Sequence, residues 1–313
     1  MSSALPTLTA LLQDPPPEFC FEISERAIVM ARTRNPAALV SQELPVGVIS
    51  ASPLRDNVLQ PEVFAAEVAR LVPPGSARKR RTAALILPDY SARLSVLDFD
   101  SFPEKAEDQE ALVRFRIRKS IPFDIDSAAI SYWRQNSPGG KSHEVVVAVT
   151  PLEIIARYEA PFRAAGLHPG LITASPLATL ELVPPDGISV VAKINGRILT
   201  VLVSHLGVLK LVRSLELTEH SLAEIAADLY PTFVYVEDNL LAPAARLLLC
   251  GFGELESVAA AQFQHELQLP VEILRSRMGA VNGTNAGLLG YLQSLHPSAA
   301  IASSAIASAG KAA

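Results

Sequence analysis

A proline-rich segment, ELVPPDG at residues 181–187, divides the chain into two halves that follow the same order of elements. Consecutive prolines and a glycine continue neither a helix nor a strand, so the segment is typical of a hinge, which we place at residues 184–187. Alternating apolar residues and turn residues indicate a hairpin, a strand, a helix and a further strand in each half. The sequence therefore predicts two similar α/β lobes.

The two ends of the chain differ in composition from its centre. Residues 1–17 finish in three prolines and predict a flexible leader, whereas residues 296–313 are rich in Ala and Ser and predict a disordered tail. Between them we expect a first lobe at residues 18–183 and a second lobe at residues 188–295.

Two segments predict tight hairpins. FCFEISERAIVMAR alternates on both sides of a turn at residues 24–27, and ISVVAKINGRILTVLVS contains Asn195-Gly196 between two alternating runs. Asn-Gly is a strong signal for a two-residue hairpin turn. Further along, SLAEIAADLYPTFVYVE predicts a helix that is interrupted at Pro231, because proline removes a helical N–H donor.

Composition narrows the classes of function. The chain has 313 residues, 49% of them hydrophobic, and 27 basic against 32 acidic residues. This balance gives no general attraction to nucleic acid. The two cysteines lack metal-binding spacing, and the polar start is unlike a secretory signal, so we expect a cytoplasmic protein. Every long apolar run is broken by a charge, so any association with a membrane is expected to occur through a partner.

The segment SFPEKAEDQEALVRFRIRKSIPF, at residues 101–123, carries the signals of a helix. Ser101 can act as N-cap with Glu104 reaching back, acidic residues precede basic ones, and Pro122 ends helical geometry. RFRIR also alternates like a strand, but the capping signals favour a helix. Its expected apolar face consists of Leu112, Val113, Phe115, Ile117 and Ile121.

The basic end of this helix admits two interpretations. Arg114, Arg118 and Lys119 are expected to point toward solvent. They either form a solvated helix end, which complements the helix dipole, or contact a partner directly.

No local motif supports catalysis. The sequence contains no G-x-S-x-G, H-E-x-x-H, P-loop or G-x-G-x-x-G, and CGFGELE lacks the third glycine of a dinucleotide loop. The six histidines are scattered without ligand spacing. We therefore expect neither a hydrolase nor a metal site.

Several segments occur in one order along residues 19–295: a hairpin, LILPDYSARLSVLDF, a helix ending in RKSIPFDIDSAAISYW, and then LLLCGFGELESV, LQLPVEIL and NAGLLGYLQ. This series resembles the PilM family of type IV pilus assembly and, more distantly, the GspL and FtsA families. The LPD to IPF block is its most specific part. The resemblance implies a two-lobed actin-like (ribonuclease H-like) α/β fold, with a PilM/FtsA-type subdomain inserted in the first lobe at about residues 84–149.

Proteins of this kind hold ATP and magnesium between the lobes, with glycine turns whose backbone N–H groups face the phosphates. The resemblance implies Asp-Ile-Gly at the first turn, where this chain has Glu22, Ser24 and Glu25. A carboxylate at Glu25 would repel a phosphate about 4 Å away by about 1 to 4 kcal/mol, unless Arg26 compensates.

The second hairpin departs from the same pattern. An acidic residue that orients the waters of the metal is expected there, but the chain has Lys193, Asn195 and Gly196. The segment between LVRSLEL and SLAEIAADL is also short, so much of the small subdomain of the second lobe is expected to be missing.

On the adenine side, the resemblance implies a Gly-Gly pair, where this chain has Gly251, Phe252 and Gly253. Phe252 is expected to occupy space that a base would otherwise use. Together these departures predict a degenerate nucleotide site, with no cofactor expected and ATP with magnesium doubtful.

The expected function is therefore a cytoplasmic scaffold of the type IV pilus inner-membrane platform. The resemblance implies a groove of the first lobe that binds the N-terminal peptide of a PilN-like membrane protein, and contacts with other platform components. A nucleotide-cycling actin-like ATPase or kinase, and a GspL-like type II secretion scaffold, are the alternatives. The residues expected at the groove are Phe102, Arg114, Phe115, Arg118, Ile121 and Phe123.

Overall fold

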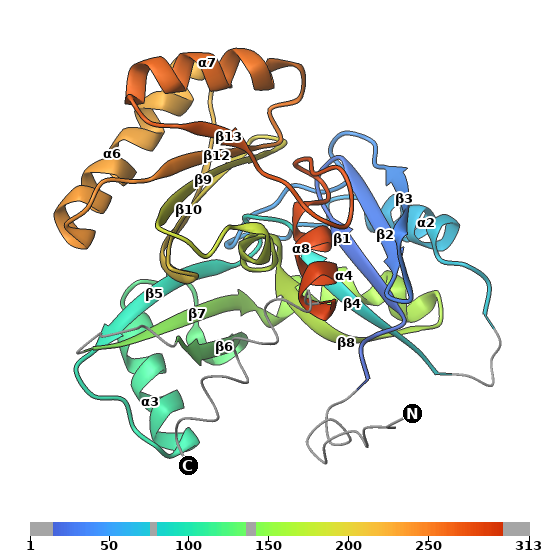
Figure 1. Ribbon diagram of the computed structural model, residues 1–313. Coiled ribbons are helices and arrows are strands. Elements are labelled where there is room, and N and C mark those ends of the chain that lie inside the picture. The colour runs from blue at the N-terminus through green and yellow to red at the C-terminus, as the bar shows by residue number, and fades with distance from the viewer. Residues whose placement is uncertain (1–14, 76–79, 136–141, 297–313) are drawn as a thin grey trace, which may run out of the picture.

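A computed structural model describes residues 15–75, 80–135 and 142–296. The first fourteen residues of the expected leader, and all but the first residue of the expected Ala/Ser tail, lie outside these ranges. The described chain forms two lobes and a smaller subdomain (Figure 1).

The first lobe is built on a five-stranded sheet of order β3-β2-β1-β4-β8. The first three strands are antiparallel neighbours, and β4 and β8 run parallel to β1. The strands are β1 (Phe19–Ile23), β2 (Ala27–Arg32), β3 (Asn35–Glu43), β4 (Arg81–Leu87) and β8 (Leu167–Ala174).

The second lobe repeats this topology strand for strand. Its sheet has the order β11-β10-β9-β12-β13, with the same pattern of antiparallel and parallel pairs. The prediction of two similar α/β lobes is confirmed. The strands are β9 (Ile188–Asn195), β10 (Ile198–His205), β11 (Val208–Glu216), β12 (Arg246–Cys250) and β13 (Val271–Ile273).

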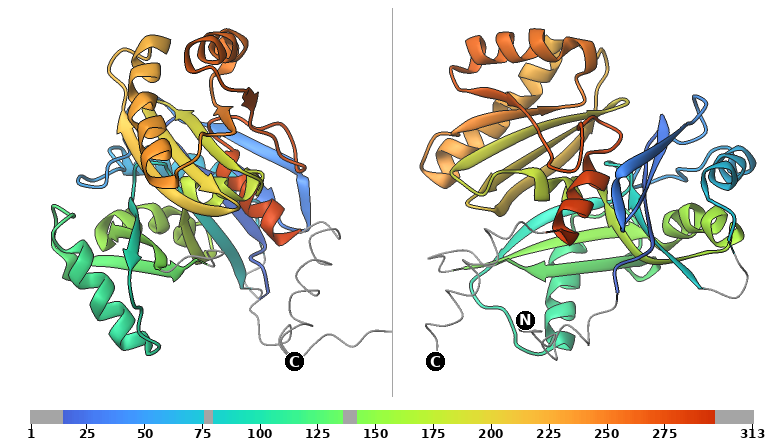
Figure 2. Two further views of the ribbon diagram at one scale, coloured as in Figure 1. Left: turned by 60° about the vertical axis from the view of Figure 1, so that its left-hand side comes forward. Right: turned by 45° about the vertical axis from the view of Figure 1, so that its right-hand side comes forward.

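Each sheet has an outer face covered by two helices (Figures 1 and 2). In the first lobe these are α2 (Pro61–Leu71) and α4 (Leu152–Ala164), and in the second lobe they are α6 (Leu222–Leu240) and α7 (Glu256–Leu267), which follows the short turn η3 (Gly253–Leu255). The core beneath them is aromatic: the ring centroids of Phe21 and Phe162 lie 4.9 Å apart. Burial of these faces supplies most of the driving force for folding.

The predicted break at Pro231 does not occur, because α6 continues through it. Ser221 caps the helix by accepting from the N–H of Glu224, and the Glu224 carboxylate accepts from the N–H of Thr218 in the preceding turn. Beyond the proline, Thr232 and Val236 are buried. Their packing against the second sheet offsets the hydrogen bond that Pro231 cannot make.

Two helices lie on the inner side of the molecule, where the lobes meet. They are α5 (Ser175–Thr179), followed by the turn η2 (Leu180–Leu182), and α8 (Ala286–Leu295). A β-carbon built on Gly290 would lie 2.0 Å from the Ala178 carbonyl oxygen, so only glycine permits this approach. Although α8 was predicted as part of the second lobe, it packs against α5 and the inner face of β1.

The inserted subdomain consists of residues 93–151. Its sheet has the antiparallel order β5-β7-β6, covered on one face by α3. The predicted start at Ala84 falls inside β4, which belongs to the first-lobe sheet, so the subdomain begins later than predicted. Its elements are β5 (Arg93–Phe99), α3 (Ala106–Ile117), η1 (Ile125–Ser127), β6 (Ala128–Arg134) and β7 (His143–Pro151).

The helix α3 is shorter at both ends than the sequence predicts. Ser101 and Glu104 lie before it and do not cap it; Lys105 is the N-cap residue and makes no side-chain cap. The reason is a tertiary contact, since Phe102 packs edge-on against Tyr132 of β6, with ring centroids 6.4 Å apart, and so holds this segment outside the helix.

The C-terminal end of α3 was also predicted too far along the chain. The helix ends at Ile117, whose carbonyl oxygen accepts hydrogen bonds from both the N–H and the hydroxyl of Ser120. Ile121 therefore lies outside the helix. Phe115, expected on the apolar face, is 73% exposed.

The second-lobe hairpin is confirmed, with its turn moved by one residue. Asn195 pairs with Ile198, so the two turn residues are Gly196 and Arg197. Gly196 takes a φ of +60°, which suits glycine at the first position of a tight hairpin turn.

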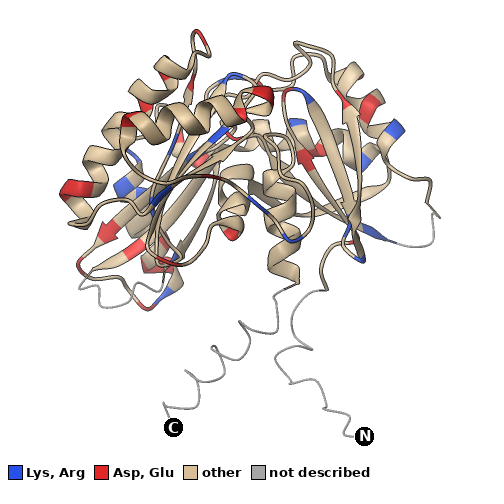
Figure 3. Cartoon of the chain, turned by 45° about the horizontal axis from the view of Figure 1, so that its top comes forward, with Lys and Arg blue, Asp and Glu red and all other residues tan. Residues whose placement is uncertain are grey.

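Charged residues of both signs are interspersed over both lobes in the view of Figure 3. Within the described residues, no helix is long and apolar enough to cross a bilayer.

Candidate functional site: the closed cleft between the lobes

In the first hairpin turn, a side chain of the turn itself forms hydrogen bonds with the backbone N–H groups. The hydroxyl oxygen of Ser24 accepts from the N–H groups of Arg26 (3.3 Å) and Ala27 (3.0 Å), and donates to the Ala27 carbonyl (2.9 Å). In a phosphate-binding turn such N–H groups would face the ligand. Here they already have a partner.

Glu25 connects this turn with two other segments. Its Oε1 accepts a hydrogen bond from the N–H of Ala51 at 2.8 Å. A β-carbon built on Gly196 would lie 3.0 Å from its Oε2, so the turns of the two hairpins are in contact. The carboxylate that was expected to repel a phosphate instead fills the space between the turns.

Lys193 lies deepest in the cleft. In β9, Val191 and Lys193 share the face that points toward the first lobe, because side chains alternate along a strand. The Lys193 side chain is fully buried, and its Nζ lies 2.7 and 2.6 Å from the two carboxylate oxygens of Asp89 and 2.9 Å from the hydroxyl of Ser175. The second lobe thus inserts an ammonium group into the first.

Glu22 lies beside this ammonium group, with its Oε1 4.0 Å from Nζ of Lys193. Its carboxylate accepts from the hydroxyl of Ser175 at 2.6 Å and from the N–H of Leu288, in α8, at 2.7 Å. Asn195 completes the group by donating to Asp89 at 3.2 Å. We call these residues the interlobe cluster: Glu22, Asp89, Ser175, Lys193 and Asn195.

Neighbouring charges in the interlobe cluster determine the protonation state of Lys193. Burial would lower the pKa of Lys193, but Asp89 and Glu22 outweigh burial and hold that pKa above its ordinary value. Burial raises the pKa of Glu22, and the offset by Lys193, Ser175 and Leu288 is only partial. Lys193 therefore stays protonated and pairs with Asp89.

Such a cluster is costly to break. Removing one partner of a buried ion pair leaves an uncompensated charge, which typically destabilises a protein by about 3–5 kcal/mol. Each lobe supplies one sign of charge here, so the pair joins the lobes, and a substitution that removes either partner leaves the other charge buried without a counter-charge.

The adenine-side glycines are closed in by backbone. A β-carbon on Gly251 would lie 2.1 Å from the carbonyl oxygen of Ile194, and one on Gly283 would lie at the same distance from that oxygen. Three chain segments therefore meet in van der Waals contact. Phe252 turns into the second-lobe core and packs edge-on against Phe263, with ring centroids 6.0 Å apart.

The inserted subdomain adds a second link between the lobes. Gln135 donates to the carbonyl of Leu209 (2.8 Å) and accepts from its N–H (2.9 Å). Glu144 forms an ion pair with Lys210 at 2.7 Å, and both side chains are largely buried. Both second-lobe residues lie at the start of β11, so the subdomain and the second lobe are joined there.

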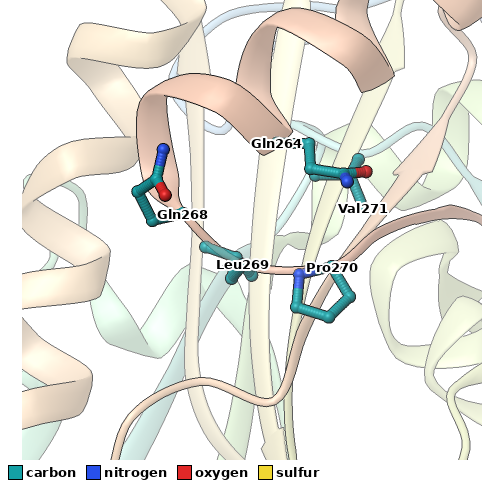
Figure 4. A pocket seen from close by; sticks show the side chains of 5 residues that line it. All are labelled: Gln264, Gln268, Leu269, Pro270 and Val271. Carbon is teal, nitrogen blue, oxygen red and sulfur yellow. The ribbon is translucent and has the colours of Figure 1, made fainter.

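A hollow on the second lobe lies apart from this cleft, between the end of α7 and the start of β13. It is lined by two glutamines and three apolar residues and contains no charged side chain (Figure 4). It offers no acid, base or nucleophile. Its lining residues are Gln264, Gln268, Leu269, Pro270 and Val271.

No protein-family model matches the sequence, and no curated protein sequence matches it. Solved structures do match. The structure described as a PilM-PilN type IV pilus biogenesis complex superposes with a TM-score of 0.72 at 19% identity, covering 90% of this chain and 100% of that one. A Bacteroides thetaiotaomicron protein of actin-like ATPase fold and unknown function gives 0.52 at 12% identity, covering 88% and 95%.

The chain has the actin-like fold of PilM. A further match, to the cytoplasmic domain of EpsL, an inner-membrane component of the type II secretion system of Vibrio cholerae, covers 74% of this chain and 80% of that one, with a TM-score of 0.45 at 12% identity. The predicted fold class, a two-lobed actin-like α/β fold, is confirmed.

Measured against the nucleotide site that the PilM resemblance implies, the residues of this cleft do not fit ATP with magnesium. The second hairpin presents an ammonium group that is already paired, and the first presents N–H groups that are already bonded. In the described part of the chain, no group of three or more His, Cys, Asp or Glu side chains is arranged to hold a metal ion.

All six residues predicted for a PilN-like peptide lie in the inserted subdomain, at different depths. Three of them pack against the core of the inserted subdomain: Phe102, Ile121 and Phe123. Phe115 and Arg118 are exposed, and Arg114 forms ion pairs with Glu110 and Asp126. The three packed side chains are half-buried, so each of the six predicted residues keeps some exposed surface.

The partners of Lys193 are the main feature that the sequence did not reveal. Asp89 lies within the LPD block, where the sequence pattern assigns it no role, and no pattern points to Ser175. Asp89 lies 104 positions from Lys193 in the chain, so only the fold brings them together. The available signal was a lysine with an apolar neighbour on each side in a buried strand, which requires a buried carboxylate partner.

Proposed function

We propose that this protein is a scaffold of the type IV pilus inner-membrane assembly platform, held closed by its own charges and without ATP hydrolysis. The observation that carries the proposal is the buried Lys193–Asp89 ion pair, which joins the lobes where related folds hold a nucleotide. A scaffold needs a fixed surface, and this pair supplies rigidity without a ligand.

The fold of a protein seen in a PilM-PilN complex supports a PilN-like partner. The partner in this proposal is the short N-terminal peptide of a PilN-like membrane protein, bound by the first lobe beside the inserted subdomain. The protein would then lie in the cytoplasm and reach the inner membrane, and other platform components, through that partner.

Arg114 and Arg118 are the predicted contacts that remain available on α3. An extended peptide gains affinity from its main chain and specificity from side-chain pockets, with charged rim residues setting orientation and association rate. The exposed Phe115 lies between the two arginines in sequence and adds apolar area.

The test is a titration of the protein with a fluorescent synthetic peptide of a PilN-like N-terminus, read by anisotropy. We expect saturable binding that weakens at least about tenfold in Arg114→Glu/Arg118→Glu, a loss of about 1.4 kcal/mol. The matched control is Arg55→Glu/Arg275→Glu, which also reverses two exposed charges. Unchanged affinity in the α3 variant would remove these residues from the site, and absence of any binding would contradict the proposed partner.

A nucleotide-cycling ATPase or kinase is the second candidate. It is favoured by three glycines that keep left-handed backbone at the expected turns: Gly196, Gly251 and Gly253. The same titration format with magnesium ATP separates the two candidates, since a cycling enzyme must bind nucleotide.

A further inference from the structure

A small hollow lies where the inserted subdomain meets the second lobe. It is formed by the start of β5, the residues just before it, and β11, and its volume is about 120 Å³. In Figure 1, β5 lies close to the second lobe. We call it the arginine hollow, lined by Tyr90, Ala92, Arg93, Leu94, Val212, Arg213 and Ser214.

Two arginines in this lining each have one buried guanidinium nitrogen without a partner. The Nε atoms of Arg93 and Arg213 are buried, and neither has a hydrogen-bond acceptor among the described residues. Arg213 donates through Nη2 only to the backbone carbonyl of Asp228. Burying a charged donor without a partner is costly, so native proteins nearly always supply an acceptor, from the chain, from water or from a bound ion.

The described residues supply no counter-charge at this place. No carboxylate among the described residues comes within 4 Å of either guanidinium, and the nearby Asp89 is held by Lys193. Arg93 makes no hydrogen bond or ion pair within the described ranges. The hollow therefore has two positive charges and no negative one.

Size and donor chemistry limit what can bind. Pockets for nucleotide-sized or drug-sized ligands measure roughly 300–1,000 Å³, which exceeds the 120 Å³ of this hollow. One tetrahedral or planar oxyanion fits, with guanidinium groups as strong donors. We propose that the arginine hollow binds a single phosphate or carboxylate group and so adds a ligand-dependent link between the inserted subdomain and the second lobe.

The test uses the whole protein and thermal unfolding, with inorganic phosphate and succinate as separate probes at constant ionic strength. A ligand at ten times its Kd should raise the Tm by about 2–4 °C in a chain of this size. A saturable rise with phosphate alone assigns a phosphoryl source, and a rise with succinate alone assigns a carboxylate source. No saturable rise with either probe would overturn the proposal.

Variants decide whether the effect arises in the arginine hollow. Arg93→Gln should lose the anion-dependent rise, Arg93→Lys should retain part of it, and the exposed Arg275→Gln should retain all of it. Without anion, Arg93→Gln should change stability little, because Arg93 is only half-buried and its Nε has no acceptor among the described residues. An equal rise in Arg93→Gln, or marked destabilisation of that variant in anion-free buffer, would assign Arg93 a structural role and contradict the site.

Discussion

The ammonium group of Lys193, in the second lobe, lies 2.7 and 2.6 Å from the two carboxylate oxygens of Asp89, in the first. Both side chains are buried. The two lobes are therefore joined at the bottom of their cleft by a buried ion pair.

Lys193→Met should destabilise the protein strongly. The methionine fills similar volume but leaves Asp89 and Glu22 buried without a counter-charge, so the free energy of unfolding should fall by about 3–5 kcal/mol. Urea unfolding measures this change. Lys119→Met, at an exposed position, should change stability by less than about 0.5 kcal/mol. Equal stability of the two variants would show that the pair contributes nothing.

The pairing itself is tested by a double-mutant cycle. Asp89→Asn in the Lys193→Met background removes the orphaned charge, so the double variant should be more stable than the sum of the single changes predicts by about 1–3 kcal/mol. Strict additivity would mean that the two residues act independently.

The adenine-side glycines provide a matched pair of substitutions. Gly251→Ala places a β-carbon 2.1 Å from the Ile194 carbonyl oxygen and also strains a φ of +82°, whereas Gly253→Ala meets no atom within 4 Å at a φ of +57°. Gly253→Ala should cost about 1–2 kcal/mol from backbone strain alone. Gly251→Ala should cost clearly more, and a smaller cost in a urea titration would contradict the close contact of these segments.

The two thiols should be inert in the native protein. Cys20 and Cys250 are buried, and burial raises the pKa of each to about 12. Because the thiolate is the reactive form, at pH 8 neither should react with a maleimide or disulfide reagent until the protein unfolds. Rapid labelling of a thiol in native buffer would show that the cleft opens, since Cys250 lies near Lys193. Labelling in guanidinium chloride serves as the control.

Sequence patterns predict those helices and strands whose structure depends mainly on residues that are neighbours in the chain. The repeated order of elements predicts both lobes, and the Asn-Gly dipeptide predicts the second hairpin to within one residue. The predictions fail where a contact between residues far apart in the sequence determines the local structure. Phe102 packs against Tyr132 of β6 and removes the predicted N-cap of α3, and packing beyond Pro231 carries α6 through a residue that should end it.

The sequence predicts the candidate site because its residues differ from those of a nucleotide site. It does not predict the contacts that these residues make. Lys193 and Glu25 are recognisable as residues that do not suit a nucleotide site, but their partners are not. Asp89, Ser175 and the N–H of Leu288 come from three separate segments. Only the fold brings them to one point, so their roles could not be read from spacing along the chain.

The most direct measurement is a calorimetric titration of the purified protein with magnesium ATP. The account predicts no heat of binding up to millimolar nucleotide, because the cleft is occupied by Lys193 and by the contact between Glu25 and Gly196. Binding with micromolar affinity would show that the interlobe cluster opens for a ligand. It would contradict the proposal of a scaffold held closed by its own charges.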